Sequence, residues 1–267
     1  MKYLSLILIL FMAMASCHHE HDHLALFAEA QWVDLTWAFD EEAVYWPTNI
    51  PFKHDTVFEG ITEKGYYYAS FKYSAEEHGG THFDAPIHFA EGGKTVEQIN
   101  LNKLMGEGVV IDVKAKVANN RDYLVSTQDF LDWEAQHGRI PEHAIILLNT
   151  GMAQYYPDKE MYAGTSLTGQ EGVDNLHFPG LHPDAAQWLV DERTINAVGL
   201  DTPSIDYGQS KDFMAHRILF PHEVTVYENV MNLDLLPPKG SWIIALPMKI
   251  KGGSGAPLRI IACLPPA

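Results

Sequence analysis

Short apolar runs alternate with helical patterns through the middle of this sequence. Three runs have the length and composition of buried strands: residues 109–113, 144–149 and 195–200. Two segments have helical spacing: residues 126–137 and 182–192. Ser126 or Thr127 can cap the first helix, with Asp129 in its first turn, and Pro183 suits the first position of the second. Strands that alternate with helices predict a mixed α/β domain rather than an all-β barrel.

The flanking parts of the chain give further patterns. Residues 66–73 alternate between two faces and predict a strand. Four more segments are expected: strands at 33–37, 224–228 and 242–246, and a short helix at 213–220. Residues 250–261 hold two apolar runs broken by a glycine-rich stretch at 252–255. Residues 151–180 have no clear period and predict a long surface excursion of the kind that often forms a lid.

The composition is that of an ordinary globular protein. The chain has 267 residues, of which 46% are hydrophobic and 20% charged, enough for one large domain or two small ones. Its 18 basic and 35 acidic residues give a formal net charge of −17. That charge repels nucleic acid and anionic membrane surfaces, so we expect no nucleic-acid partner.

The first residues have the pattern of an export signal. Lys2 precedes an apolar run over residues 4–14, and two small residues then lead to Cys17. The ending Met-Ala-Ser-Cys resembles the lipobox of bacterial lipoproteins, whose cysteine is lipidated after cleavage; the alternative is plain secretion with cleavage nearby. We predict a signal peptide at residues 1–16. The mature protein is expected to be periplasmic or anchored to the membrane only through a lipid on Cys17.

A polar tether is predicted at residues 17–31. Its tract His-His-Glu-His-Asp-His, at 18–23, could bind metal ions loosely but lacks apolar surroundings that would fix a geometry. The cysteines are Cys17 and Cys263, so lipidation of the first leaves no internal disulfide. We assign residues 32–267 to the folded domain.

The stretch from 78 to 89 reads His-Gly-Gly-Thr-His-Phe-Asp-Ala-Pro-Ile-His-Phe and concentrates metal-ligand side chains. His78, His82, Asp84 and His88 supply imidazole nitrogens and a carboxylate, which are ligands for Zn²⁺, Mn²⁺ or Fe²⁺. A hydrolytic metal needs several such ligands and one open position for water. Local sequence could therefore supply most of a metal site.

The backbone of this stretch is expected to be extended. Two glycines and Pro86 oppose a helix, so we place the motif on a strand or extended loop. Residues two apart on a strand share a face, which would point the three histidines and Asp84 the same way. The alternative is a set of ordinary polar residues on a solvated strand. The shared parity and the adjacent glycines favour a metal site.

A polar turn follows the third apolar run. It reads Asp-Thr-Pro-Ser-Ile-Asp-Tyr-Gly, residues 201–208, at a common position for site loops in α/β sheets. Asp201, Ser204 and Asp206 could hydrogen-bond a substrate or orient a ligand, although turn formation explains them equally well. Trp46, in an aromatic loop, could wall a pocket or simply pack in the core.

The motif at 78–89 resembles the signature of the cyclase family of metal-dependent hydrolases, which includes bacterial kynurenine formamidase and isatin hydrolase. Other segments resemble that family's landmarks: Asp34-Leu35-Thr36, Asp201-Thr202-Pro203-Ser204, His216 with Glu228 twelve residues later, and Leu246-Pro247 before Gly252-Gly253. The resemblance covers roughly residues 32–264. The first motif is specific, whereas the later ones would be weak alone.

The resemblance implies a fold, a ligand set and an assembly. The fold is α/β, a single compact mixed-sheet domain of the cyclase type over residues 32–267, usually assembled as dimers or higher oligomers. The implied metal ligands, completing a one- or two-metal centre, are His78, His82, Asp84, His216 and Glu228. His88 is implied as the acid/base, but it could itself be a ligand, and Glu228 could be the base that activates water. Zn²⁺ and Mn²⁺ accept the same donors.

Such a centre predicts hydrolysis of an amide. A divalent ion lowers the pKa of a bound water from 15.7 to about 7 and polarises a carbonyl oxygen, and a nearby imidazole can carry protons to the leaving nitrogen. We expect a small aromatic amide or lactam as substrate. The leading prediction is an arylformamidase-like enzyme that converts N-formylkynurenine to kynurenine and formate. The alternatives are an isatin-type lactam hydrolase and a lipid-anchored protein that binds a metal or small ligand without turnover.

Overall fold

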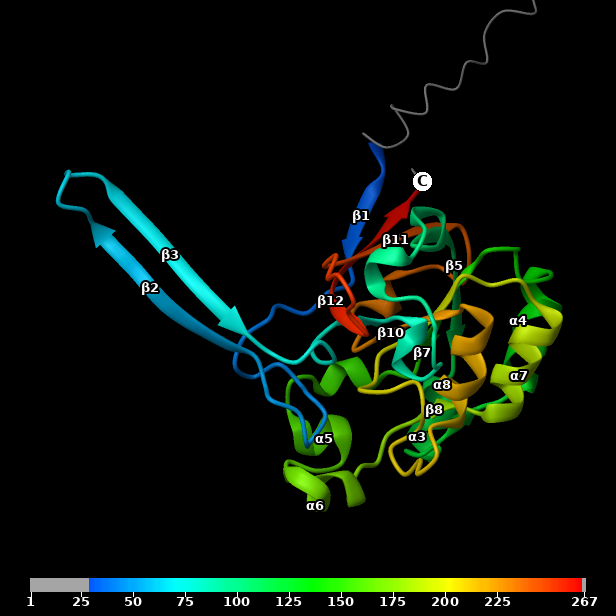
Figure 1. The fold of residues 1–267 in the computed structure, drawn as a ribbon. Helices are drawn as coiled ribbons and strands as arrows, with labels where there is room; N and C mark the ends of the chain where they lie inside the picture. Colours follow the sequence, from blue (N-terminus) through cyan, green and yellow to red (C-terminus); the bar gives the residue numbers. More distant parts are fainter. Residues whose placement is uncertain (1–28, 266–267) are drawn as a thin grey trace, which may run out of the picture. The chain divides into compact units, whose positions relative to one another are not determined.

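An eight-stranded mixed sheet forms the centre of the fold, which the computed structural model describes for residues 29–265 (Figure 1). The strands lie in the order β1 (Gln31–Asp34), β12 (Gly255–Leu264), β11 (Ser241–Pro247), β5 (Met105–Asp112), β7 (Ile145–Asn149), β9 (Ala197–Leu200), β10 (Thr225–Glu228) and β4 (His82–Asp84). Strands β5, β7, β9 and β10 are mutually parallel. Because β4 pairs with both β10 and β12, the strands from β12 to β4 close into a ring.

The three apolar runs predicted as buried strands form β5, β7 and β9. Side chains alternate along each strand, so the sheet separates two apolar cores. Ile146 and Leu148 of β7 face the core that the helices cover, whereas Ile145 and Leu147 face the core inside the ring. The α/β prediction is confirmed, and the ring is a feature that the apolar runs alone do not reveal.

Helices α4 (Thr127–His137), α7 (Pro183–Glu192) and α8 (Met214–Leu219) pack against the outer core (Figure 1). Of the two predicted caps of α4, the structure uses Ser126: Asp129 Oδ2 accepts hydrogen bonds from the Ser126 N–H at 2.7 Å and its hydroxyl at 2.8 Å. Pro183 occupies the first position of α7, as predicted.

Short elements connect these parts. They are η1 (Pro86–His88), η2 (Val96–Gln98), η3 (Leu101–Lys103), α3 (Lys114–Asn119), β6 (Leu124–Val125), η4 (Met152–Tyr155), α5 (Lys159–Ala163), α6 (Gly169–Asp174), β8 (Gly180–Leu181), η5 (Phe220–His222) and η6 (Leu233–Leu235).

The prediction of a long surface excursion at residues 151–180 is wrong. The segment contains η4, α5, α6 and the first residue of β8, and it buries Tyr162 and Phe178 completely. The Tyr162 hydroxyl donates to the Asn229 side-chain oxygen at 2.9 Å. Helices of five and six residues are too short to give a detectable period, which is why the pattern did not predict them.

Strands β2 (Lys53–Ile61) and β3 (Tyr67–Ser74) form a separate antiparallel hairpin, drawn in cyan in Figure 1. The alternating pattern at 66–73 predicts β3 to within one residue. Strand β2 gave no such signal because a bulge between Thr56 and Phe58 interrupts its alternation. Most side chains of the hairpin are exposed on both faces.

The predicted signal peptide and nearly all of the predicted tether lie outside the described residues, so these assignments stay predictions. Between residues 29 and 265, the helices are all too short or too polar to cross a membrane.

Candidate metal centre

Strand β4 and its neighbour β10 bring three of the predicted ligands together. His82 and Asp84 are two residues apart on β4, and the distance from His82 Nε2 to Asp84 Oδ1 is 3.2 Å. Glu228, the last residue of β10, pairs with His82 across the sheet and places Oε2 3.3 Å from His82 Nε2. The strand register thus assembles one imidazole and two carboxylates on one face.

Helix α8 adds His216 from the outer side of the sheet. Its Nε2 lies 3.4 Å from Asp84 Oδ2 and 3.4 Å from Glu228 Oε1. Asp206, in the turn after β9, accepts a hydrogen bond from His216 Nδ1 at 2.6 Å and another from the Ala215 N–H at 2.8 Å. Asp206 therefore orients His216, one of the two roles that its position suggested.

His78 reaches the cluster from the loop before β4. Its Nδ1 lies 2.7 Å from Asp84 Oδ1. Gly80 has φ +56°, so the chain is not extended between His78 and His82, and the shared parity of the motif does not explain the position of His78. At Gly79 a Cβ atom would lie 2.1 Å from the Tyr45 ring, so this glycine permits the loop to pack closely.

His88 lies on η1 rather than on the strand, because Pro86 begins that short helix. Its ring stacks on His78 with a centroid distance of 3.7 Å and an interplanar angle of 16°. Two groups each offer ligand atoms within 4.8 Å of one another: His78, His82 and Asp84, and Asp84, His88 and His216. This geometry is compatible with both predicted roles of His88, proton carrier and ligand.

Burial makes the charges of this cluster interdependent. Asp84 is 1% exposed and Glu228 4%. Burial raises the pKa of Asp84, but His82 and His78 hold it well below its usual range. Burial lowers the pKa of His88 to about 3, so its imidazole is neutral. The cluster therefore combines buried negative charge with one uncharged imidazole.

When protonated, the buried His82 and His216 can carry the compensating positive charge. Burial lowers the pKa of His82, but Asp84 and Glu228 outweigh it and raise that pKa to about 10. Burial likewise lowers the pKa of His216, and Asp206, Asp84 and Glu228 together raise it well above its usual value. The carboxylates thus require positive charge at this position, which protons or a cation can supply.

Outer hydrogen bonds turn unprotonated nitrogens toward a cation. His82 Nδ1 lies 3.0 Å from the Gly80 carbonyl oxygen, and His216 Nδ1 lies 2.6 Å from Asp206. When each Nδ1–H donates to its outer acceptor, a neutral ring presents a bare Nε2 to the carboxylates. Imidazole nitrogen and carboxylate oxygen are the donors of Zn²⁺ and Mn²⁺ sites, so these residues fit a divalent metal.

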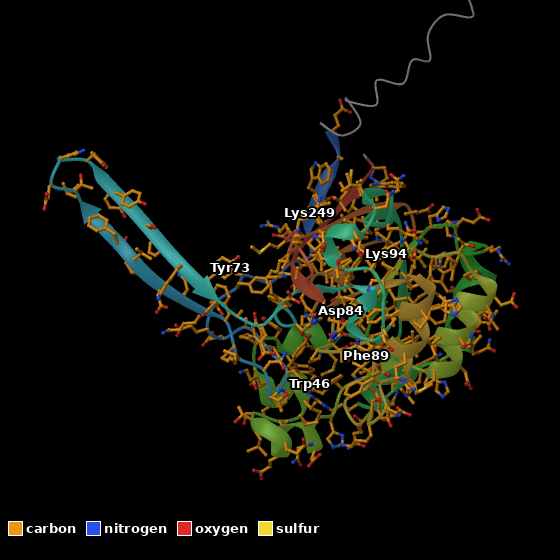
Figure 2. All side chains as sticks on the ribbon, in the orientation of Figure 1. Trp46, Tyr73, Asp84, Phe89, Lys94 and Lys249 are labelled. Carbon is orange, nitrogen blue, oxygen red and sulfur yellow. The ribbon has the colours of Figure 1, made fainter. Side chains whose placement is uncertain are left out.

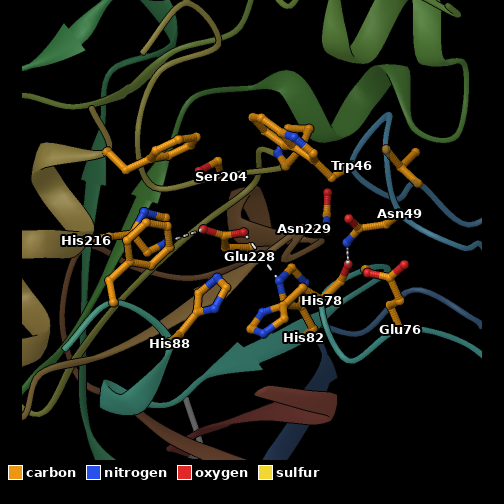
Figure 3. Close-up of a pocket in the computed structure, with 15 residues that line it drawn as sticks. Trp46, Asn49, Glu76, His78, His82, His88, Ser204, His216, Glu228 and Asn229 are labelled. Carbon is orange, nitrogen blue, oxygen red and sulfur yellow. Dashed lines mark hydrogen bonds and ion pairs between the residues drawn. The ribbon is translucent and has the colours of Figure 1, made fainter. Parts of the chain in front are cut away.

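A pocket of about 250 Å³ opens onto the cluster (Figure 3). Trp46 lines it, as one of the two interpretations of that residue predicted. Ser204 also lines it, but Asp201 instead accepts hydrogen bonds from the Thr150 N–H and hydroxyl, at 2.8 and 2.6 Å. Sequence patterns did not identify several other lining residues: Asn49, Glu76, Phe89, Phe213 and Asn229. Among the described residues that line the pocket, none is lysine or arginine.

Comparisons with known proteins agree with the motif. The family model described as putative cyclase matches residues 33–207. The isatin hydrolase of Roseibium aggregatum is 32% identical over 200 residues, covering 72% of this chain and 73% of that protein. The kynurenine formamidase of Bacillus mycoides is 27% identical over 239 residues, covering 87% and 97%. The structure of isatin hydrolase A from Ralstonia solanacearum matches with a TM-score of 0.81 at 31% identity, covering 93% of this chain and 98% of that one.

Proposed function

This chain belongs to the cyclase family of metal-dependent hydrolases, and from that premise we propose that it hydrolyses the C–N bond of a small aromatic amide or lactam. The observation that carries the proposal is the convergence of imidazoles and two buried carboxylates at an aromatic-lined pocket. Two relatives are named for amide-bond hydrolysis, of isatin and of a formamide, and so support the same bond class.

The proposed metal is a divalent ion, Zn²⁺ or Mn²⁺. The residues that would hold it are His78, His82, Asp84, His216 and Glu228. When bound, such an ion lowers the pKa of water to about 7 and polarises a carbonyl oxygen.

The protein's own residues supply the proton transfers and the substrate position. His88 stacks on His78 beside the cluster, so it is placed to carry a proton from the attacking water to the leaving nitrogen. Trp46, Phe89 and Phe213 line the pocket and can hold a flat aromatic ring while excluding water from the amide.

Two substrates are proposed in this class. N-formylkynurenine remains the first candidate, and the kynurenine formamidase covers 87% of this chain, although isatin hydrolase A covers 93%. An isatin-type lactam is the second. The described residues that line the pocket include no lysine or arginine, so the carboxylate of N-formylkynurenine would find no lysine or arginine partner there. This observation favours the isatin-type lactam. Comparing kcat/KM for the two compounds decides between them.

Removal of the metal tests the proposed activity. The purified mature domain should contain a divalent metal by elemental analysis, lose hydrolysis of both substrates after treatment with a chelator, and regain it on addition of Zn²⁺ or Mn²⁺. His82→Ala should lose both metal and activity. Undiminished hydrolysis by a protein free of metal would refute the proposal.

Deletion of residues 18–23 separates the enzyme from a lipid-anchored metal-binding protein. In an enzyme, tight metal binding and turnover depend on the folded site, so the deletion should change neither. If the deletion abolishes metal uptake and no substrate is hydrolysed, the binding protein is the better description.

We also propose that the protein is exported and lipid-anchored at Cys17. The support is the sequence pattern at residues 1–17 alone. Labelled palmitate should be incorporated into the full-length protein in a bacterial host and not into the Cys17→Ser variant. A soluble, unlabelled protein in the periplasm would instead support plain secretion.

The third proposal concerns assembly: two copies of the chain associate through the hairpin of β2 and β3. One face of the hairpin exposes four large apolar side chains, Ile61, Tyr67, Phe71 and Tyr73, each at least 45% exposed; Tyr73 is labelled in Figure 2. A two-stranded hairpin has little stability in water, and an apolar face of this size marks an interaction surface. An interface on this face would bury these four apolar side chains, which the hairpin by itself leaves exposed to solvent.

Charge favours a second copy as the partner. Residues 53–74 contain three lysines and three acidic residues, so this segment is neutral in a chain of net charge −17. Two equally acidic copies meet with least repulsion at a neutral surface. Sedimentation analysis should give a dimer for the unaltered protein and a monomer for the Tyr67→Ser/Phe71→Ser variant. A dimer in both would place the interface elsewhere.

A further inference from the structure

The glycine-rich break at residues 252–255, which leads into β12 and includes its first residue, has no role in the chemistry described so far. This break lies against Glu77, the residue before His78. The Ser254 N–H and hydroxyl both donate to Glu77 Oε2 at 2.8 Å, and the Gly255 N–H donates to the same oxygen at 3.1 Å. A single carboxylate oxygen thus fixes the loop.

The loop also fits closely around the His78 ring. A Cβ atom at Gly255 would lie 2.5 Å from His78 Cε1 and 2.7 Å from the Phe83 carbonyl oxygen. Glycine is therefore required at 255 for the ring to occupy its position. Because the loop packs against the ring, Ser254 Oγ lies 2.9 Å from His78 Nε2.

These hydrogen bonds determine which nitrogen of His78 carries its proton. The Ser254 hydroxyl has one proton, which it donates to Glu77, so Ser254 Oγ accepts from His78 Nε2–H. When the His78 ring is neutral, its one N–H is therefore Nε2–H, and Nδ1, which lies 2.7 Å from Asp84 Oδ1, is bare and can bind a cation. His82 and His216 have the opposite arrangement, since their outer hydrogen bonds engage Nδ1.

We propose that Glu77 and Ser254 are positioning residues that hold His78 in the Nε2–H form, so that His78 binds the metal through Nδ1. This inference rests on the proposed metal centre. It gives the 252–255 loop a function: the loop supplies the outer hydrogen bond that a backbone carbonyl and Asp206 supply to the other two histidines.

Zinc binding by three variants tests the proposal. Ser254→Ala removes the acceptor for Nε2–H, and its Zn²⁺ affinity in competition with a chelator should fall about 10- to 100-fold. Ser254→Thr keeps a hydroxyl and should restore most of that affinity. Glu97→Gln is the matched control, because Glu97 holds the other end of the loop through the Gly252 N–H at 2.9 Å and does not contact His78. Its Zn²⁺ affinity should stay close to that of the unaltered protein.

Nitrogen-15 NMR of the unaltered, zinc-loaded protein gives a direct readout that needs no variant. It should show His78 protonated at Nε2 and metal-bound at Nδ1. A proton on Nδ1, or full Zn²⁺ affinity in Ser254→Ala, would overturn the proposal.

Hydrolysis by the unaltered protein distinguishes the two proposals. If it hydrolyses amides while Ser254→Ala binds zinc normally, only the positioning inference fails. If Ser254→Ala loses zinc but the unaltered zinc-loaded protein hydrolyses neither substrate, only the proposed function fails.

Discussion

Asp206→Asn perturbs the support of His216 without changing the size of the side chain. Asp206 is buried, and its carboxylate accepts from His216 Nδ1 at 2.6 Å and from the Ala215 N–H at 2.8 Å. The substituted amide has one oxygen and one NH₂ group. If the oxygen keeps the Ala215 bond, the NH₂ group faces Nδ1 and favours the tautomer with its proton on Nε2, toward Asp84 and Glu228.

Asp206→Asn should lower both the metal affinity and the folding stability, and the structure indicates which loss is larger. Loss of the hydrogen-bond partner of a metal-binding histidine costs about 10- to 100-fold in metal affinity, or about 1.4–2.7 kcal/mol. The substituted NH₂ group also removes the acceptor for the His216 N–H, 3.3 Å from Asp206 Oδ2 at the start of α8, which costs about 1 kcal/mol of folding free energy. For a chain of this size, that lowers the melting temperature by about 2–4 °C. The variant should therefore remain folded and bind metal poorly.

The assay combines chelator competition for Zn²⁺ with thermal unfolding of the metal-free protein. Asp201→Asn is the control, because Asp201 is buried in the same turn but bonds to Thr150. It should leave the Zn²⁺ affinity unchanged whatever it does to the melting temperature. An unchanged Zn²⁺ affinity in Asp206→Asn would show that this carboxylate only stabilises the fold, and the reasoning would be refuted.

Three further substitutions test the site and the fold. His88→Ala should keep the metal and lose turnover; loss of metal, measured by elemental analysis, would make His88 a ligand. Arg193→Met removes the guanidinium that donates to both carboxylate oxygens of Glu134, at 2.8 and 2.6 Å. Because Glu134, whose side chain is 13% exposed, loses its ion pair and keeps the hydrogen bond from the Ile140 N–H, the free energy of unfolding in urea should fall by about 3 kcal/mol, and an unchanged value would contradict this. Burial raises the pKa of Asp129, but hydrogen bonds led by that from Lys116 hold it below 3.8. Its folded pKa is depressed, so it stabilises the fold above pH 3.8 and loses this contribution as the pH falls through the folded pKa. Asp129→Asn should flatten the acid side of the melting-temperature profile, and an unaltered profile would refute the assignment.

Elements with a local signal were predictable, whether that signal is a continuous apolar run or a helical spacing with a cap. The apolar runs of β5, β7 and β9 and the capped helix α4 depend on local burial and local hydrogen bonds. Elements of one or two turns, such as α5 and α6, and the bulged strand β2 lack such a signal. Closure of the ring also gives no local signal, because it depends on β12 pairing with a strand more than 170 residues earlier in the chain.

The candidate site divides in the same way. The identity of the ligand-type residues follows from the motif. Strand alternation explains why His82 and Asp84 point to the same face of β4. Alternation does not account for His78 and His88, because Gly80 has a positive φ and Pro86 begins a helix. Family resemblance, rather than any local pattern, linked the distant His216 and Glu228 to this motif.

By itself the sequence determined the α/β class, the main strands and helices, and the donor types of a metal site, because these depend on neighbouring residues and on side-chain chemistry. Tertiary structure alone decided how those donors meet. The register of β10 on β4 places Glu228 beside His82, and Asp206 turns His216 inward. Ser254, 176 residues from His78, contacts its ring. Such contacts depend on how distant segments pack, and no local pattern in the chain encodes them.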